Sequence, residues 1–218
     1  MGPDASHCPD TNPMSLTIFG IPRSRTFRVL WAAEELGLAY HNVPVDFIDG
    51  VKAPEFLAVN PNGRIPAIED NGFVLWESFA ITLYLARKHG AGSLYPDSPE
   101  GEARALQWSF WGANEIESPL IQLVFNRYVY PPENRSESVA AQAEAKLPRP
   151  LAVLDAHLER HGTLLGDGFG IADLNVASLL YNAWFNKVDL ARWPHVSAWL
   201  DACLTRPAAL RARNLRET

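Results

Sequence analysis

The sequence predicts two successive units, a small mixed α/β domain followed by an all-α domain. Short apolar runs bounded by turn residues alternate with helical patterns as far as about residue 89, whereas no convincing strand pattern follows Pro99. Between them lies GAGSLYPDSPEG, whose three Gly and two Pro in twelve residues indicate a linker. We therefore expect an α/β domain over residues 15–89, a linker over 90–98 and a helical domain over 99–218.

The first predicted elements form a βαβ unit. Residues 16–19 (LTIF) are a short apolar run bounded by turn residues, which is typical of a buried strand. The stretch after Ser24, RTFRVLWAAEELG, carries apolar residues at helical spacing and ends at Gly37. Residues 40–45 alternate enough to be a second strand. Such a unit is expected to be right-handed, with its two strands parallel.

A short helix, a hairpin and a longer helix complete the first domain. The short helix begins with a proline at residue 54, a position that suits proline. Residues 67–70 and 73–76 are strand-like runs separated by Asn71-Gly72, a pair that favours the type I′ turn of a two-residue hairpin. The last helix begins at Ser78. The predicted order is therefore βαβαββα.

Helical patterns account for the second domain. Helices are predicted at about 99–127, 137–160, 171–185 and 194–204. Proline inside a helix removes a hydrogen bond and clashes with the preceding turn. We therefore expect a kink or break in the second of these helices, at Pro148 and Pro150. The basic C-terminal stretch is expected to be a solvated tail; its arginines are Arg206, Arg211, Arg213 and Arg216.

Composition excludes several classes of protein. The chain has 218 residues, of which 47% are hydrophobic and 20% charged, as in ordinary globular proteins. No apolar run is long enough for a transmembrane helix, and a net charge of −6 argues against nucleic acid as the main partner. The two cysteines, Cys8 and Cys203, form no disulfide framework and no zinc ligand set. We expect a cytoplasmic protein without a signal peptide, with residues 1–14 as a disordered extension.

Three stretches of the sequence resemble the glutathione transferase family. They are PRSRTFRVLWAAEELGL, NPNGRIPAIEDNGFVLWESFAITLYLARKH and GDGFGIADLNVAS, and the resemblance spans about residues 15 to 210. The middle stretch is the most specific of the three. The resemblance implies a thioredoxin-like N-terminal domain, an all-helical C-terminal domain with the pocket for a hydrophobic co-substrate, and glutathione as the other substrate. The third stretch is assigned to folding, with Asp173 at the start of a helix and Gly170 where the family usually has Ser or Thr.

The resemblance also implies how glutathione is held. Glu77 and Ser78 stand at a helix start, where free backbone N–H groups attract an anion. In the family the γ-glutamyl end of glutathione binds there. The pair Ile65-Pro66 matches the cis-proline of the fold, which leaves the backbone of Ile65 free to pair with the cysteinyl part. A cation suits the glycyl carboxylate, and the candidates are Lys52 and Arg64.

Ser24 is the candidate catalytic residue. The family's reaction is attack by the glutathione sulfur, and the thiolate is the nucleophile. A Ser hydroxyl at the start of the first helix can donate a hydrogen bond to that sulfur, helped by the helix dipole. Serine-type members differ by one residue in where the serine falls, so the alternative register places Arg23 there. Arg23 or Arg25 would share the role through charge in that case. A separate alternative is that Ser24 is only a helix cap.

The sequence therefore predicts a serine-type glutathione S-transferase. The glutathione thiolate, stabilised by the enzyme, would attack a small hydrophobic electrophile without a metal. The resemblance also implies a homodimer. Two alternatives stay open. One is a glutathione-dependent disulfide or peroxide reductase, and the other is a non-enzymatic relative that binds ligands or interacts with proteins.

Overall fold

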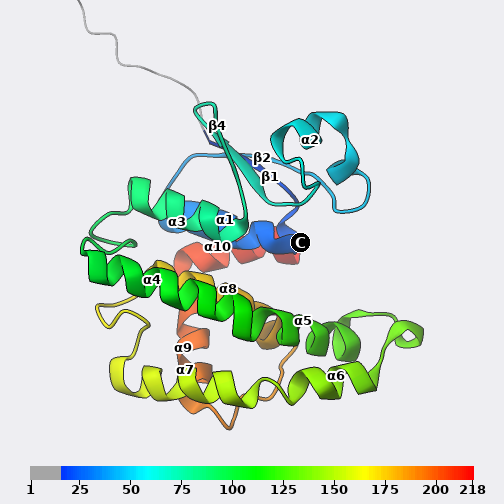
Figure 1. The fold of residues 1–218 in the computed structure, drawn as a ribbon, viewed down its shortest axis with the longest axis vertical. Helices are drawn as coiled ribbons and strands as arrows, with labels where there is room; N and C mark the ends of the chain where they lie inside the picture. Colours follow the sequence, from blue (N-terminus) through cyan, green and yellow to red (C-terminus); the bar gives the residue numbers. More distant parts are fainter. Residues whose placement is uncertain (1–15) are drawn as a thin grey trace, which may run out of the picture.

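A four-stranded sheet with its helices precedes an all-helical part, which confirms the predicted fold class. The structure is a computed structural model that describes residues 16–218. The expected disordered extension, residues 1–14 with Cys8, lies outside the described residues. In Figure 1 the sheet lies at the top and the helical part below it. Within the described range, no helix has both the length and the apolar character that a membrane span requires.

The sheet has the order β2-β1-β3-β4. Strand β1 pairs in parallel with β2, whereas β1 with β3 and β3 with β4 are antiparallel. Asn71 and Gly72 join β3 to β4 with φ angles of 51° and 82°, both positive as a type I′ turn requires. The strands are β1 (Leu16–Phe19), β2 (His41–Val43), β3 (Ala67–Asp70) and β4 (Phe73–Trp76).

Strand β2 is shorter than the expected 40–45. It ends at Val43 because the next residue, Pro44, has no backbone N–H to donate to a neighbouring strand. The chain then passes through a short turn, η2 (Gly50–Lys52), into α2 (Pro54–Val59). Helices α1 (Phe27–Glu35) and α3 (Ser78–His89) lie between the sheet and the helical part, whereas α2 lies away from that interface (Figure 1).

The first two expected helices of the second part both differ in detail. The expected 99–127 helix is one continuous helical stretch that reaches residue 129 through π-type turns. It consists of α4 (Pro99–Trp111), η3 (Gly112–Glu117), α5 (Ser118–Val124) and η4 (Phe125–Val129). The expected 137–160 helix breaks at residues 145–147 into α6 (Glu137–Glu144) and α7 (Pro148–His161). Pro148 is the first residue of α7, where a missing N–H leaves no hydrogen bond unmade.

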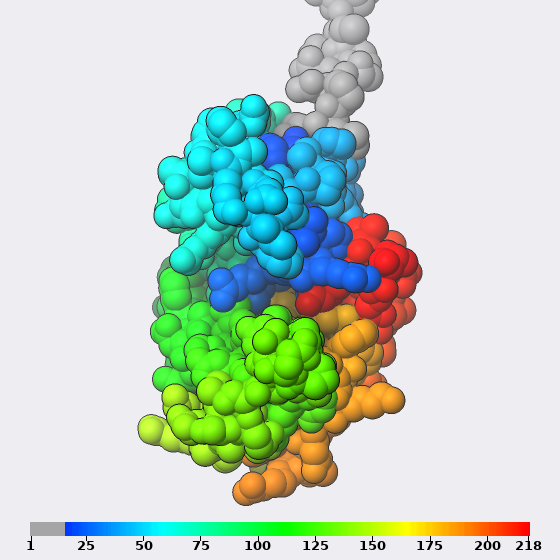
Figure 2. Space-filling model, turned by 90° about the vertical axis from the view of Figure 1, so that its right-hand side faces the viewer, coloured from blue at the N-terminus to red at the C-terminus, as the bar shows by residue number. Residues whose placement is uncertain are grey.

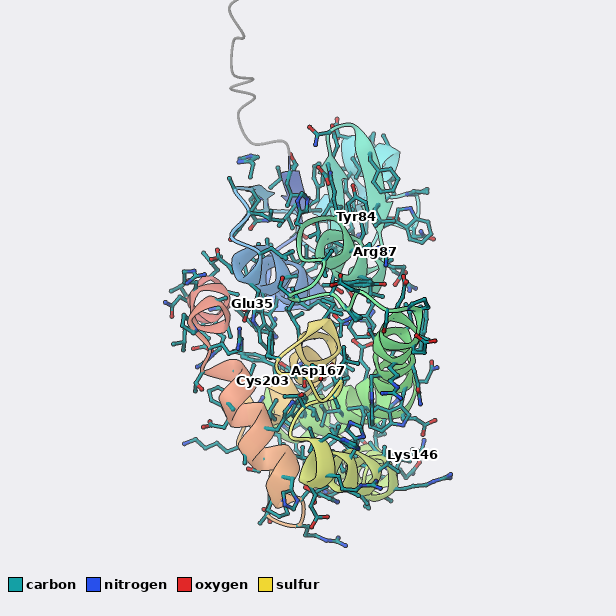
Figure 3. All side chains as sticks on the ribbon, turned by 90° about the vertical axis from the view of Figure 1, so that its left-hand side faces the viewer. Glu35, Tyr84, Arg87, Lys146, Asp167 and Cys203 are labelled. Atoms are coloured by element: carbon teal, nitrogen blue, oxygen red, sulfur yellow. The ribbon has the colours of Figure 1, made fainter. Side chains whose placement is uncertain are left out.

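The remaining helices are α8 (Ile171–Phe185), α9 (Pro194–Leu204) and α10 (Pro207–Glu217). The expectation of a solvated C-terminal tail is wrong, because α10 packs along α1. It buries a face of small residues, Ala208, Ala209 and Ala212, which lets the two helices approach closely. Arg206 forms a two-pronged ion pair with Glu35 at 2.7 and 2.9 Å, and Figure 3 shows Glu35 beside α10.

Helix α8 is the centre of the helical part, and nearly every residue along it is buried. Buried polar groups need partners, and Asp173 has three N–H donors for its carboxylate. They are the backbone N–H of Leu164 and of Gly170, both at 3.0 Å, and the indole N–H of Trp199 at 2.8 Å. Asp173 therefore holds the start of α8 and also joins it to α9.

Asn175 links the two parts of the molecule. Its side-chain oxygen accepts a hydrogen bond from Thr82 Oγ1 of α3 at 2.8 Å, and its nitrogen donates to Ser109 Oγ of α4 at 2.9 Å. All three side chains are buried. This network holds α3 against α4 and α8, and so sets the spacing across the domain interface where the pocket lies.

Candidate active site

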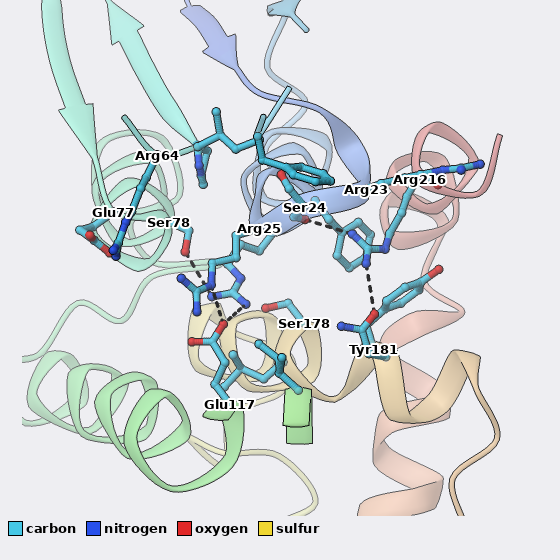
Figure 4. A pocket seen from close by; sticks show the side chains of 18 of the residues that line it. Arg23, Ser24, Arg25, Arg64, Glu77, Ser78, Glu117, Ser178, Tyr181 and Arg216 are labelled. Atoms are coloured by element: carbon cyan, nitrogen blue, oxygen red, sulfur yellow. Dashed lines mark hydrogen bonds and ion pairs between the residues drawn. The ribbon is translucent and has the colours of Figure 1, made fainter. Parts of the chain in front are cut away.

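A pocket of about 570 Å³ lies between the sheet-containing part and the helical part. Its upper wall comes from the loop before α1, the loop before β3 and the start of α3, and its lower wall from η3, α5, η4 and α8. Arg216 of α10 closes one side. Figure 2 shows this face, with the blue N-terminal segment beside the red C-terminal helix and above the green helices. Figure 4 shows the pocket from close by.

The loop before α1 is shaped by Ser24. Its backbone is extended, with φ −125° and ψ −164°, and Arg23 before it is also non-helical. Its hydroxyl accepts a hydrogen bond from the Thr26 N–H at 3.1 Å and lies 2.7 Å from the carbonyl oxygen of Ile21, to which it donates. Ser24 thus lines the pocket, and its hydroxyl is engaged in hydrogen bonds within its own loop.

Gly20 allows this loop to fold back on itself. It has a φ of +134°, which few other residues adopt, and a Cβ at this position would collide with Thr26 Oγ1. The close approach places Ser24 and the start of α1 beside the end of β1. The N-terminus of α1, with its positive end, therefore faces the pocket.

Arg216 is a pocket residue that sequence reasoning missed. Its Nη1 donates to the carbonyl oxygens of Pro22 at 2.9 Å and Ser24 at 3.0 Å, and its Nη2 donates to Asn182 Oδ1 at 3.1 Å. The guanidinium also lies 4.6 Å from the ring centroid of Tyr181. Burial lowers the pKa of Arg216, yet an arginine keeps its proton at any ordinary pH.

No carboxylate pairs with the Arg216 guanidinium among residues 16–218. Its hydrogen-bond partners are the neutral oxygens just described, and the nearby carboxylate of Glu217 offsets its charge only from beyond ion-pair distance. A partly buried cation without a directly paired carboxylate raises the affinity of its surroundings for an anion. The helical spacing of Ala208, Ala209 and Ala212 was the available signal that this segment is a helix, although it does not show what the helix packs against.

Arg28 and Glu117 form a buried ion pair across the domain interface. Arg28 Nη2 lies 2.9 Å from Glu117 Oε1, and Arg28 Nη1 donates to Ser78 Oγ at 3.2 Å. Burial lowers the pKa of Arg28, and the neighbouring carboxylate of Glu117 opposes that shift. Arg25 binds the same oxygen of Glu117 through Nε at 2.9 Å. One carboxylate therefore serves two arginines.

The start of α3 brings Glu77 and Ser78 into the pocket. Glu77 precedes the helix with a φ of 74° and is exposed, whereas Ser78 is the first helical residue and is buried. Ser78 and the first turn of α3 point toward the centre of the pocket in Figure 4. The N–H groups of this first turn are the ones that a helix leaves without internal partners, and they suit a carboxylate.

The loop before β3 contributes Arg64, Ile65 and Pro66 to the pocket, and the Ile65–Pro66 peptide bond is cis. Asn60 supports this loop through a hydrogen bond from its Nδ2 to the Arg64 carbonyl oxygen at 2.6 Å. Lys52 is different. Its ammonium pairs with Asp49 at 3.3 Å, its side chain is 71% exposed, and it is not among the residues that line the pocket.

The structure thus brings six of the seven predicted site residues into one pocket. They come from three loops far apart in the sequence: Ser24, Arg64, Ile65, Pro66, Glu77 and Ser78. Arg23 and Arg25, the alternative activators, also line it. Sequence reasoning missed Arg28, Glu117 and Arg216. Arg28 lies inside a helix whose pattern indicates a core helix. Glu117 and Arg216 lie in the second part of the chain, where no motif indicated a site.

Comparison with known proteins agrees with this geometry. The glutathione S-transferase N-terminal domain model matches residues 14–87, and the C-terminal domain model matches residues 116–207. Glutathione S-transferase GstB of Escherichia coli K12 is 30% identical over 88% of this chain and 95% of its own. Glutathione S-transferase 3 of Zea mays is 36% identical over 88% of this chain and 90% of its own.

A solved structure supports the same assignment. The theta class glutathione S-transferase of Xanthomonas axonopodis pv. citri, with glutathione bound, superposes with a TM-score of 0.85. It is 32% identical, and the match covers 92% of this chain and 97% of that one. With both domain models matched and relatives aligned over most of their length, this chain belongs to the glutathione S-transferase family.

Proposed function

We propose that this transferase binds glutathione across the upper wall of the pocket and joins it, through its sulfur, to a small hydrophobic electrophile. The observation that carries the proposal is the meeting of three segments in one pocket: the Ser24 loop, the Ile65–Pro66 loop and the start of α3. Each supplies one kind of contact that an extended tripeptide needs. The apolar lower wall, with Ile121 and Phe125, suits the second substrate.

The γ-glutamyl group would bind at the start of α3. Its carboxylate would accept hydrogen bonds from Ser78 and the first N–H groups of the helix, and its ammonium would lie beside Glu77. Ile65 would pair with the cysteinyl backbone through its own N–H and C=O. Arg64 would hold the glycyl carboxylate. Lys52 would join it there only if its side chain left Asp49.

The chemical step requires a thiolate. A free cysteine thiol has a pKa of about 8.5, so most of it is protonated at neutral pH. The positive end of α1 and the charge of Arg216, which forms no ion pair among the described residues, both favour the thiolate beside Ser24. The Ser24 hydroxyl would complete the site by rotating from the Ile21 carbonyl toward the sulfur. The thiolate then forms the S–C bond, and the leaving group departs with the electron pair of the bond that breaks.

Conjugation fits these residues better than disulfide exchange. Among the described residues the one cysteine is Cys203, which is buried in α9 and does not line the pocket. Burial raises the pKa of Cys203, so its thiol is a poor nucleophile. The described residues therefore place no cysteine thiol in the pocket, and the reactive sulfur there would be that of glutathione itself.

We further propose a homodimer that works in the cytoplasm, where reduced glutathione is held. Support for the homodimer comes from apolar side chains exposed outside the pocket. Phe73 and Trp76 of β4 are 48% and 39% exposed, and Phe110 of α4 is 60% exposed. Exposed apolar surface of this kind marks sites of association. Light scattering coupled to size-exclusion chromatography would read the mass, and a mass near the chain's 24.2 kDa would reject the dimer.

A calorimetric titration with glutathione tests the catalytic proposal. Run at neutral pH in two buffers of different ionisation enthalpy, it reports both affinity and protons released. We expect nearly one proton to be released, because the bound thiol ionises. Binding without proton release would contradict the thiolate mechanism, and no binding at millimolar glutathione would reject the site. The variant Ser24→Ala then reports how much of the ionisation depends on the hydroxyl.

A further inference from the structure

The pocket is strongly cationic although the chain is acidic. Five arginines and two glutamates are the charged residues that line it, and the whole chain carries a net charge of −6. A cleft lined mainly by one sign of charge concentrates ligands of the opposite sign. The charged lining residues are Arg23, Arg25, Arg28, Arg64, Arg216, Glu77 and Glu117.

Glutathione accounts for only part of this charge. In the proposed pose it occupies the upper wall, at Arg64, Glu77 and Ser78. The space beneath Ser24 is left for the electrophile. There Glu117 is the carboxylate that faces the pocket, and Arg25 and Arg28 share a single oxygen of it. The second subsite therefore keeps positive charge that neither glutathione nor Glu117 cancels.

Two arginines border that space. In Figure 4, Arg25 reaches down from the Ser24 loop on one side and Arg216 enters on the other, with Ser178 and Tyr181 of α8 below. The Arg25 side chain is 49% exposed and uses only its Nε, toward Glu117. Within residues 16–218 its two terminal nitrogens donate no hydrogen bond. A guanidinium fork with free N–H groups matches a carboxylate.

We propose that the electrophile is an apolar molecule that carries a carboxylate or a similar anionic group, and that Arg25 is the residue that selects it. The inference rests on the proposed function, since it concerns the second substrate of the same site. The apolar body would lie against Ile121, Phe125 and Tyr181. The anionic group would bind the free N–H groups of Arg25, in the field of Arg216. It takes no part in bond making.

A matched pair of substrates tests the inference. The first is 4-chloro-3,5-dinitrobenzoate and the second is its methyl ester, which differ in charge but hardly in shape. In both, the thiolate sulfur bonds to the ring carbon and chloride leaves with the electron pair of the C–Cl bond. We would measure kcat/KM for each and divide by the uncatalysed rate with glutathione at the same pH, because the two substituents activate the ring unequally.

The wild type should favour the carboxylate over the ester after this correction. In Arg25→Gln the carboxylate-to-ester ratio should fall about tenfold, the loss expected for one charge-assisted hydrogen bond. The control is Arg160→Gln, which removes the same charge from an exposed position on α7 outside the pocket. It should leave the ratio within about twofold, because long-range effects of exposed charges are screened.

An unchanged ratio in Arg25→Gln, or a wild type that favours the ester, would overturn the inference. Proton release in the calorimetric titration is independent of both probes, so the proposed function would survive that result. If neither probe reacts, the dissociation constants of the two finished glutathione conjugates decide. Tighter binding of the carboxylate conjugate, lost in Arg25→Gln, supports the inference, and equal binding rejects it.

Discussion

Removing the charge of Arg216 should raise the pKa of the bound glutathione thiol. The substitution is Arg216→Gln, which keeps most of the side-chain length and one hydrogen-bond donor group. Arg216 Nη1 lies 3.0 Å from the Ser24 carbonyl oxygen, so a sulfur beside Ser24 would lie roughly 6 Å from the guanidinium. At an effective dielectric of about 20 to 40, one charge at that distance contributes about 1.4 to 2.8 kcal/mol. That corresponds to a rise of roughly one to two pKa units.

Two measurements report this pKa. One is the ultraviolet absorbance of the thiolate, followed over pH with glutathione bound, and the other is the pH dependence of kcat/KM. A positioning role for Arg216 would lower the rate at every pH alike, whereas a charge effect moves the midpoint. Arg216→Lys keeps the charge but not the two-pronged fork, so its midpoint should lie nearer the wild type than that of Arg216→Gln.

Arg211→Gln is the control on the same helix. Arg211 pairs with Glu34 and does not line the pocket, so its loss removes an equal charge and an ion pair with α1. Its thiol pKa should match the wild type within a few tenths of a unit. A wild-type midpoint in Arg216→Gln, or an equal shift in Arg211→Gln, would refute the assignment of the charge to Arg216.

Three further predictions concern stability. Glu117→Gln removes the countercharge of buried Arg28 and should cost about 2 kcal/mol or more; an unchanged melting temperature would contradict the buried ion pair. Asn175→Ala breaks the network between α3, α4 and α8 and should cost about 1 to 3 kcal/mol in urea unfolding, more than Asn186→Ala at the end of α8. Burial raises the pKa of Asp70, but hydrogen bonds from Lys88 and Tyr84 outweigh it and hold the pKa below its ordinary value. This depressed pKa stabilises the fold above about pH 4 and loses its effect as pH falls through it, so the deficit of Asp70→Asn should shrink in acid; a deficit independent of pH would refute this.

Local turn chemistry made the first part of the fold predictable. The Asn71-Gly72 turn is set by two residues that tolerate positive φ, and the structure has both angles positive. The helix start at Ser78 and the break before Pro148 follow from similar short-range preferences. The error at α10 has a different origin. Its arginines favour a solvated surface, and the sequence does not show that its alanine face is buried against α1, almost 180 residues away.

The candidate site likewise has residues that the sequence predicts and residues that it does not. The residues proposed to bind glutathione stand in short motifs, so the resemblance predicts Ile65, Glu77 and Ser78. The charged residues that would lower the thiol pKa and bind the second substrate lie in no recognisable motif. Arg216 reaches the Ser24 loop across 192 residues, and Glu117 reaches Arg28 across 89. Which arginines are buried, and which lack a carboxylate, depends on how α10 and the α4–α5 stretch dock onto α1, and a single sequence holds no local signal of that docking.

Under the proposed mechanism, α10 is part of the reactive site and not only of the scaffold. Arg216 binds the carbonyl oxygens on both sides of Arg23, and Arg23 Nε donates back to the Arg216 carbonyl oxygen at 3.2 Å. The helix therefore fixes the loop that carries Ser24 and supplies charge to it through the same side chain. Loss of the last few residues would remove both effects together, whereas Arg216→Lys separates them. A truncated chain should bind glutathione at the start of α3, which packs against α1 and α8, yet release little of its thiol proton.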